Sequence, residues 1–215
     1  MTRTLAILAL AGLVACGESN ATAGGGTIIV GSAADADALL PGIVRSTQGR
    51  IASELLFDRL ADLGPSLQTM GDSGFIPRLA QRWSWSTDTL QLTLHFDPDA
   101  RWHDGQPVRS SDLAFALRMV REPALASSIM PDVASIDSIA TPDSVTAVVH
   151  FGYRESEQFY SVSLLVPLPA HLYDSIPAAD LRTHPLARAP IGSGDRKSTR
   201  LNSSHVRTSR MPSSA

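Results

Sequence analysis

The sequence predicts an α/β fold, and three patterns indicate it. Apolar and polar residues alternate from Leu90 to Phe96, which is the period of a half-buried strand. After Ser110 and Ser111, apolar residues recur at helical spacing up to Val120, which predicts an amphipathic helix. Segments 133–139 and 144–151 flank a Thr-Pro-Asp turn and predict a β-hairpin. Hairpins mixed with short helices favour an α/β lobe over a helical bundle.

The amino terminus has the features of a secretory signal. Arg3 precedes an apolar run from Leu5 to Val14; as a helix these residues would span roughly 15 Å, about half of a bilayer core. The run ends in Leu-Val-Ala-Cys, which resembles the lipobox of bacterial lipoproteins. We therefore expect residues 1–15 to be a signal peptide and Cys16 to be lipidated. An ordinary signal peptide cleaved near Cys16 is the alternative.

Residues 16–26 are predicted to be a flexible tether, because they are polar and rich in glycine. Cys16 is the only cysteine, so its lipidation leaves no thiol for a disulfide or a metal site. Residue 17 is not the aspartate associated with retention in the inner membrane, so the sequence leaves the membrane of residence open.

The elements that open the globular part follow in order. The β-branched run from Thr27 to Ser32 predicts the first strand, and residues 33–37 follow as a loop. Thr47 is predicted to cap a helix over residues 49–60. Its residues available for burial are Ile51, Leu55, Phe57 and Leu60.

Two turns separate the central strand from the next helix. Asp97-Pro98-Asp99 ends the strand, because proline fixes its own backbone angle and disfavours helix before it. His103-Asp104-Gly105 makes the second turn. Ser110 or Ser111 is the expected N-cap, Asp112 suits the positive end of the helix, and Leu113, Leu117 and Val120 form its apolar stripe.

The remaining segments predict further short elements. Residues 124–130 predict a short helix after Pro123. Residues 155–165 predict another helix, with Phe159 and Val162 on one side, which Pro167 and Pro169 end. A helical turn is expected over 170–174.

Motifs in this order resemble the family-5 extracellular solute-binding proteins, the peptide- and nickel-type receptors of ABC importers. The resemblance runs from about Thr27 to Gly194. It is carried by W-H-D-G-Q-P-V followed by S-S-D-L-A-F-A-L, by P-R-L-A at Pro77–Ala80, by V-P-L-P-A-H at Val166–His171 and by P-I-G-S-G at Pro190–Gly194. Phe96-Asp97 departs from the family, whose members usually carry a basic residue there.

The resemblance implies the amino-terminal part, residues 27–194, of a two-lobed periplasmic-binding-protein type II (Venus flytrap) fold whose second lobe is missing. It implies ligand contacts from the loop Ala33, Ala34 and Asp35, no catalytic residue, no cofactor and no metal site. The expected ligand is a peptide or a similar small solute, and the expected partners are a membrane permease and its ATPase. The protein is expected to be a monomer, held by lipid on the periplasmic or extracellular face. The nickel branch stays open.

Two other classes of function remain. Gly71-Asp72-Ser73-Gly74 is compatible with an exported hydrolase, but no histidine lies in a recognisable catalytic motif beside it. A structural or adhesive lipoprotein is the other alternative. The histidines show no spacing typical of metal ligands, which favours structural or surface roles for them.

Residues 195–215 are predicted to be a non-native, disordered tail. Reverse translation of Asp195–His205 and of Ser209–Ala215 resembles a sequencing-library adapter and its continuation. The tail holds the only lysine, Lys197. Its net charge is +4, so the formal charge of −3 becomes −7 without it. This acidity argues against nucleic-acid binding.

Overall fold

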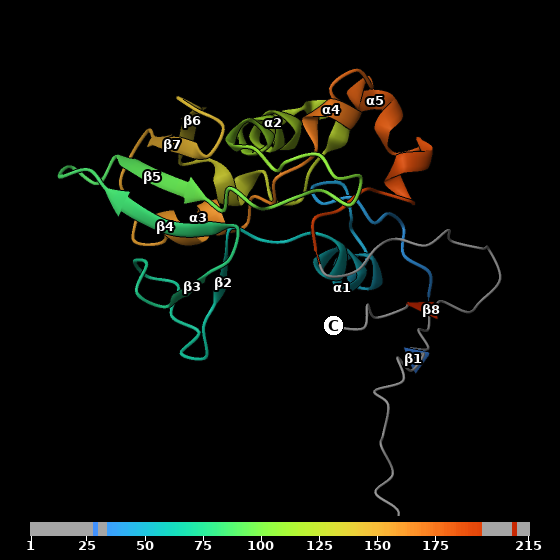
Figure 1. Ribbon diagram of the computed structural model, residues 1–215, viewed down its shortest axis with the longest axis horizontal. Coiled ribbons are helices and arrows are strands. Elements are labelled where there is room, and N and C mark those ends of the chain that lie inside the picture. Colours follow the sequence, from blue (N-terminus) through green and yellow to red (C-terminus); the bar gives the residue numbers. More distant parts are fainter. Residues whose placement is uncertain (1–27, 30–33, 195–207, 210–215) are drawn as a thin grey trace, which may run out of the picture.

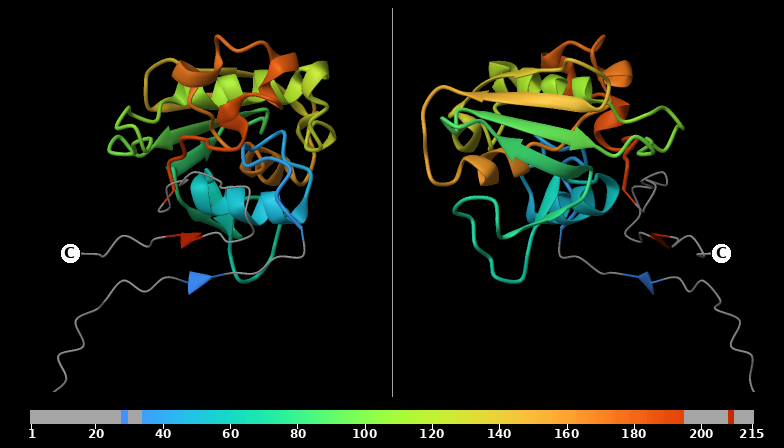
Figure 2. Two further views of the ribbon diagram at one scale, coloured as in Figure 1. Left: turned by 90° about the vertical axis from the view of Figure 1, so that its right-hand side faces the viewer. Right: turned by 60° about the vertical axis from the view of Figure 1, so that its left-hand side comes forward.

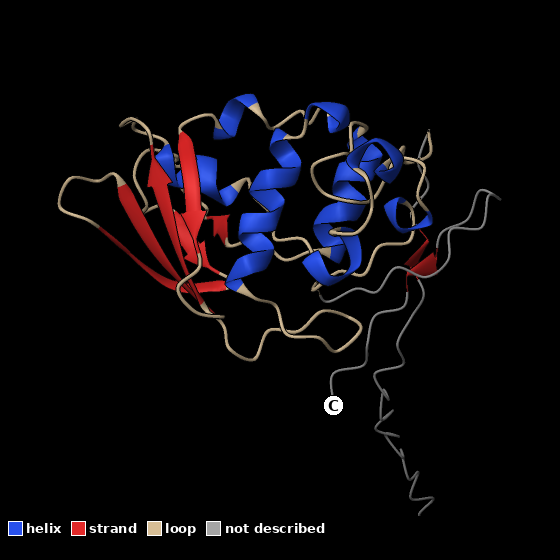
Figure 3. Cartoon of the chain, turned by 90° about the horizontal axis from the view of Figure 1, so that it is seen from above, coloured by secondary structure: helices blue, strands red, loops and turns tan. Residues whose placement is uncertain are grey.

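A four-stranded antiparallel sheet forms one end of the computed structural model, which describes residues 28–29, 34–194 and 208–209 (Figure 1). Its strands are β4 (Ala80–Trp85), β5 (Gln91–Phe96), β6 (Ile136–Ala140) and β7 (Thr146–Phe151), in the order β4-β5-β7-β6. The predicted central strand and hairpin are therefore confirmed, with shorter bounds. In Figure 3 the strands gather at one end of the body and most helices extend from there.

The two faces of this sheet differ in polarity. The register places Trp83 opposite Leu94, and Leu92 opposite Val149, so these side chains share one face. Leu92, Leu94 and Val149 on that face are fully buried. Thr93, which points the other way, is only half-buried. The apolar face therefore packs into the core and the polar face points outward.

Helix α2 (Ser110–Arg121) is the longest helix of the described part and packs against β6 and β7. Leu113, Leu117 and Val120 are buried as predicted, and burying each such side chain stabilises the fold by about 1.5–3 kcal/mol. The predicted cap is wrong. Arg109 is the N-cap residue, and the Ser110 hydroxyl donates a hydrogen bond to the Asp143 carbonyl.

An aromatic cluster joins the sheet to a second, smaller hairpin. This hairpin consists of β2 (Ala61–Leu63) and β3 (Phe75–Pro77) and projects from the body (Figure 1). Phe159 of α3 (Gln158–Ser163) lies 4.7 Å from Phe75 and 4.6 Å from Trp83, measured between ring centroids. Phe159 and Val162 are buried, which confirms the predicted apolar side of this helix.

Helix α1 (Thr47–Leu56) differs from its prediction in cap and in buried face. Ser46 is the N-cap, and its hydroxyl accepts the Gly49 N–H. The chain is already extended at Phe57, so the helix is shorter than expected. Ile51 and Leu55, predicted to be available for burial, are 58% and 45% exposed. Phe57 and Leu60 are buried, but from the extended segment that follows the helix.

Short helices complete the body, and in Figure 2 an orange helical segment lies against α2, which is yellow-green. They are α4 (Ala170–Tyr173), α5 (Ala178–Leu181) and three 3-10 turns, η1 (Pro123–Leu125), η2 (Pro131–Val133) and η3 (Pro185–Ala187). The turn over 170–174 is confirmed. The prediction of one helix over 124–130 is wrong. This part of the chain forms two separate 3-10 turns, η1 and η2, and each begins with a proline, a residue that does not fit inside a helix.

The first strand, β1 (Ile28–Ile29), falls within the predicted one and pairs with β8 (Thr208–Ser209). The signal peptide and tether lie outside the described residues. So does the predicted tail apart from β8, and its non-native origin stays a prediction.

Candidate functional site

The loop predicted to contact ligand is exposed at its described residues, and the chain that follows it is anchored in the core. Ala33 lies outside the described residues, while Ala34 and Asp35 are exposed. The chain turns inward directly after them, because Leu39 is buried and its N–H donates to the Ala187 carbonyl at 2.8 Å. The structure therefore presents this loop on the surface and anchors its carboxyl-terminal end.

Asp37 organises the other end of this segment. Its carboxylate accepts the Arg45 N–H at 2.9 Å, the Ser46 N–H at 3.0 Å and the Ser46 hydroxyl at 2.6 Å. Partial burial by itself would raise the pKa of Asp37, but these hydrogen bonds together outweigh it and lower the pKa to about 2. The carboxylate thus ties the loop to the start of α1.

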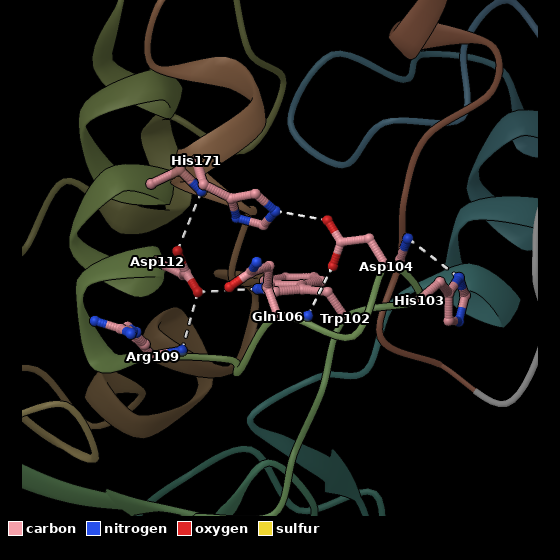
Figure 4. A network of polar contacts seen from close by, with 9 residues as sticks. Trp102, His103, Asp104, Gln106, Arg109, Asp112 and His171 are labelled. Carbon is pink, nitrogen blue, oxygen red and sulfur yellow. Dashed lines mark hydrogen bonds and ion pairs between the residues drawn. The ribbon is translucent and has the colours of Figure 1, made fainter.

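A buried carboxylate, Asp112, joins three segments behind the W-H-D-G turn (Figure 4). It accepts the Trp102 Nε1–H at 3.1 Å, the Arg109 N–H at 2.9 Å and the Ala170 N–H at 3.1 Å. Burial raises the pKa of Asp112, even though all three hydrogen bonds act in the opposite direction. Sequence reasoning placed Asp112 at the helix end but missed its role as a junction.

The turn itself is held by a second carboxylate. Asp104 accepts the Gln106 N–H at 3.0 Å and lies 2.7 Å from His171 Nε2 (Figure 4). Partial burial would raise the pKa of Asp104, but the contacts with His171 and Gln106 prevail and lower it. His171 of α4 and His103 of the turn were predicted to have structural or surface roles. Both are hydrogen-bonded, His171 to Asp104 and His103 to the Gly192 and Gly194 backbone.

The Gly71–Gly74 segment has a structural explanation. One oxygen of Asp72 accepts the indole N–H groups of Trp83 and Trp85, at 2.9 and 3.0 Å. Ser73 is exposed, and Asp72 is engaged with the two indoles. This arrangement differs from a triad, in which the carboxylate orients a histidine.

Two shallow pockets open on the described surface. One, of about 360 Å³, is lined by residues of four segments of the chain, among them Asp58, Arg78, Arg101 and Ser193. The other, of about 300 Å³, lies beside the end of α2 and is lined mainly by apolar atoms. Neither includes Ala34 or Asp35, so the described part of the predicted ligand loop lines neither of these two pockets.

The described residues contain no group of three or more histidine, cysteine or acidic side chains arranged to hold a metal ion. Nor does any helix among them have the length and apolar character needed to cross a bilayer.

Comparison with known proteins identifies the family. Residues 74–202, more than half of the chain, match the model of bacterial extracellular solute-binding proteins, family 5. The match ends just inside the predicted tail. A protein of Brucella melitensis, named as an ABC transporter peptide-binding protein, is 32% identical over 117 residues, which is 54% of this chain and 22% of the relative. A periplasmic alpha-galactoside-binding protein of Rhizobium meliloti is 36% identical over 61 residues, 28% of this chain and 9% of that protein.

Solved structures share the fold. The oligopeptide-binding protein AppA of Bacillus subtilis, solved with a nonapeptide, superposes with a TM-score of 0.68 at 17% identity, over 80% of this chain and 33% of AppA. NikZ of Campylobacter jejuni, solved with Ni(L-His), gives 0.61 at 23% identity, over 71% and 29%. The chain thus spans about a third or less of these proteins, which fits the predicted partial lobe of a type II fold. It belongs to the bacterial extracellular solute-binding proteins of family 5.

Proposed function

We propose that the whole protein is the receptor of an ABC importer, which captures peptides outside the cytoplasmic membrane and delivers them to a permease. The observation that carries this proposal is the 32% identity to relatives named as peptide-binding proteins of ABC transporters. The shared fold alone is not decisive, because proteins with this fold have been solved with a nonapeptide and with Ni(L-His).

The loop Ala33, Ala34 and Asp35, of which Ala34 and Asp35 are exposed, is proposed to contact the ligand. Two of its three side chains are small, which suits the close approach of an extended peptide to a receptor's main chain. The anchoring of the segment through Leu39 and Asp37 would keep this backbone in place before ligand arrives, which lowers the ordering cost of binding.

Binding is proposed to close two lobes around the ligand, as a shift of population from open to closed forms. The described part supplies one incomplete lobe. We therefore expect the 215-residue chain to bind peptide negligibly, while the uninterrupted product of the same gene binds it.

Isothermal titration of both proteins with peptides of three to nine residues tests this. Nickel–histidine and a galactoside serve as competing ligand classes. Micromolar peptide binding by the longer protein supports the proposal. Comparing the peptide affinity of Asp35→Ala with that of Asp99→Ala, an exposed control, tests whether the loop contributes to binding. Binding of only nickel–histidine or the sugar would refute the peptide assignment, and micromolar peptide binding by the 215-residue chain would refute the need for a second lobe.

Anchoring is proposed to occur through lipid on Cys16. The support is the position of this cysteine directly after the apolar run; two or more acyl chains are needed for stable attachment. Metabolic labelling with a palmitate analogue should mark the wild-type protein and not Cys16→Ser. Equal labelling of both would rule out this anchor.

The hydrolase alternative predicts an activity that is lost in Ser73→Ala. Because Asp72 is occupied by two indoles, we expect no such activity.

A further inference from the structure

The imidazole of His103 holds the backbone of the Pro190–Gly194 segment. Its Nδ1 atom accepts the Gly192 N–H at 3.3 Å (Figure 4). Its Nε2 atom lies 2.7 Å from the Gly194 carbonyl oxygen. The His103 backbone N–H adds a third bond, to the Gly192 carbonyl at 2.8 Å. Since a carbonyl only accepts and a backbone N–H only donates, the ring must be neutral with its proton on Nε2.

The end of α1 closes the other side of the same segment. The Gly194 N–H donates to the Leu56 carbonyl at 2.9 Å, and the Asp58 N–H donates to the Ser193 hydroxyl at 3.1 Å. A Cβ atom at residue 192 would lie 1.8 Å from the Leu56 oxygen. The segment therefore runs in a narrow slot between α1 and the imidazole, and only glycine fits at 192.

We propose that His103 is a positioning residue whose neutral, Nε2-protonated form clasps the Pro190–Gly194 segment. The W-H-D-G and P-I-G-S-G motifs then work as one structural unit, although they lie far apart in the sequence. The clasp also sets the position of Ser193, which lines the larger pocket together with Asp58. This inference concerns the described lobe and does not depend on which solute the protein binds.

The Nδ1 atom has to stay free of a proton for this arrangement to hold. A proton on Nδ1 would face the Gly192 N–H, so that two donors oppose each other.

Amide hydrogen exchange in the 215-residue chain tests the proposal. In His103→Ala we expect the protection factor of the Gly192 amide to fall about tenfold relative to the wild type, the scale of one net hydrogen bond. The Leu94 amide in the sheet serves as the internal reference. His103→Asn places an amide oxygen near the Nδ1 position, so its Gly192 amide should stay protected.

The control is His95→Asn, which changes a half-buried histidine of β5 and should leave the Gly192 protection as in the wild type. Nitrogen-15 chemical shifts of the wild-type ring report the tautomer and need no variant. A ring protonated on Nδ1, or Gly192 protection that is unchanged in His103→Ala, would overturn the proposal.

Discussion

Removing the Asp112 carboxylate should destabilise the lobe more than any surface change, because it joins three segments at once. In Asp112→Ala, the indole N–H of Trp102 and the backbone N–H groups of Arg109 and Ala170 lose their acceptor. Hydrogen bonds to a charged group contribute about 1.5–3 kcal/mol each. The same substitution also removes the cost of burying a charged carboxylate, and this gain offsets part of the loss.

We therefore expect a net loss of about 4 kcal/mol from the free energy of unfolding. A domain of this size loses roughly 2–4 °C in Tm per kcal/mol, so Tm should fall by roughly 8–16 °C. Asp112→Asn keeps one acceptor oxygen, which can serve both Trp102 and Arg109, and should lose about half as much.

Thermal unfolding followed by far-UV circular dichroism measures these shifts, with urea titration as a second measure. Asp99→Ala, at an exposed turn position, is the matched control and should shift Tm by no more than about 2 °C. If Asp112→Ala melted within the same range, Asp112 would not be the junction described above.

Three further changes test other contacts. Gly192→Ala should abolish stable folding or lower Tm by more than roughly 10 °C, because its Cβ would overlap the Leu56 oxygen. Gly152→Ala, whose Cβ would meet only the Ser135 oxygen at an ordinary 4.0 Å, should be nearly silent in the same melt. Asp37→Asn should destabilise the protein near neutral pH. Since folding lowers the Asp37 pKa from 3.8 to about 2, the carboxylate's contribution is present above 3.8 and is lost as pH falls towards 2. The stability difference from wild type should therefore shrink over that range in urea titrations, and a constant difference would contradict the assignment. Asp72→Ala should leave two indole donors unpaired and lower stability by about 2–3 kcal/mol, with a shift in tryptophan emission; unchanged emission and stability would count against the structural role of this turn.

Elements governed by local periodicity were predictable from the sequence. The alternation through Leu92 and Leu94 placed β5, and the spacing of Leu113 and Leu117 placed α2, because each pattern states which face is buried. Family membership was predictable too, since it depends on the order of motifs along the chain, such as W-H-D-G before P-I-G-S-G.

Other features depended on which segments meet in space. Nothing local distinguishes Ile51 and Leu55, which are exposed, from buried residues, because burial of a helix face requires a partner surface. The N-cap of α2 is Arg109 and not a serine. The Asp112 side chain accepts the Arg109 N–H, and the Ser110 hydroxyl donates its hydrogen bond to the Asp143 carbonyl instead of capping the helix.

The sequence by itself determined the α/β class, the main strands and helices, and the resemblance that the family comparison confirmed. Only the tertiary structure decided that Asp112 and His103 are junctions and that Asp72 holds two indoles. Their partners lie on other elements, and a buried polar group gains its role from the donors that the fold brings to it.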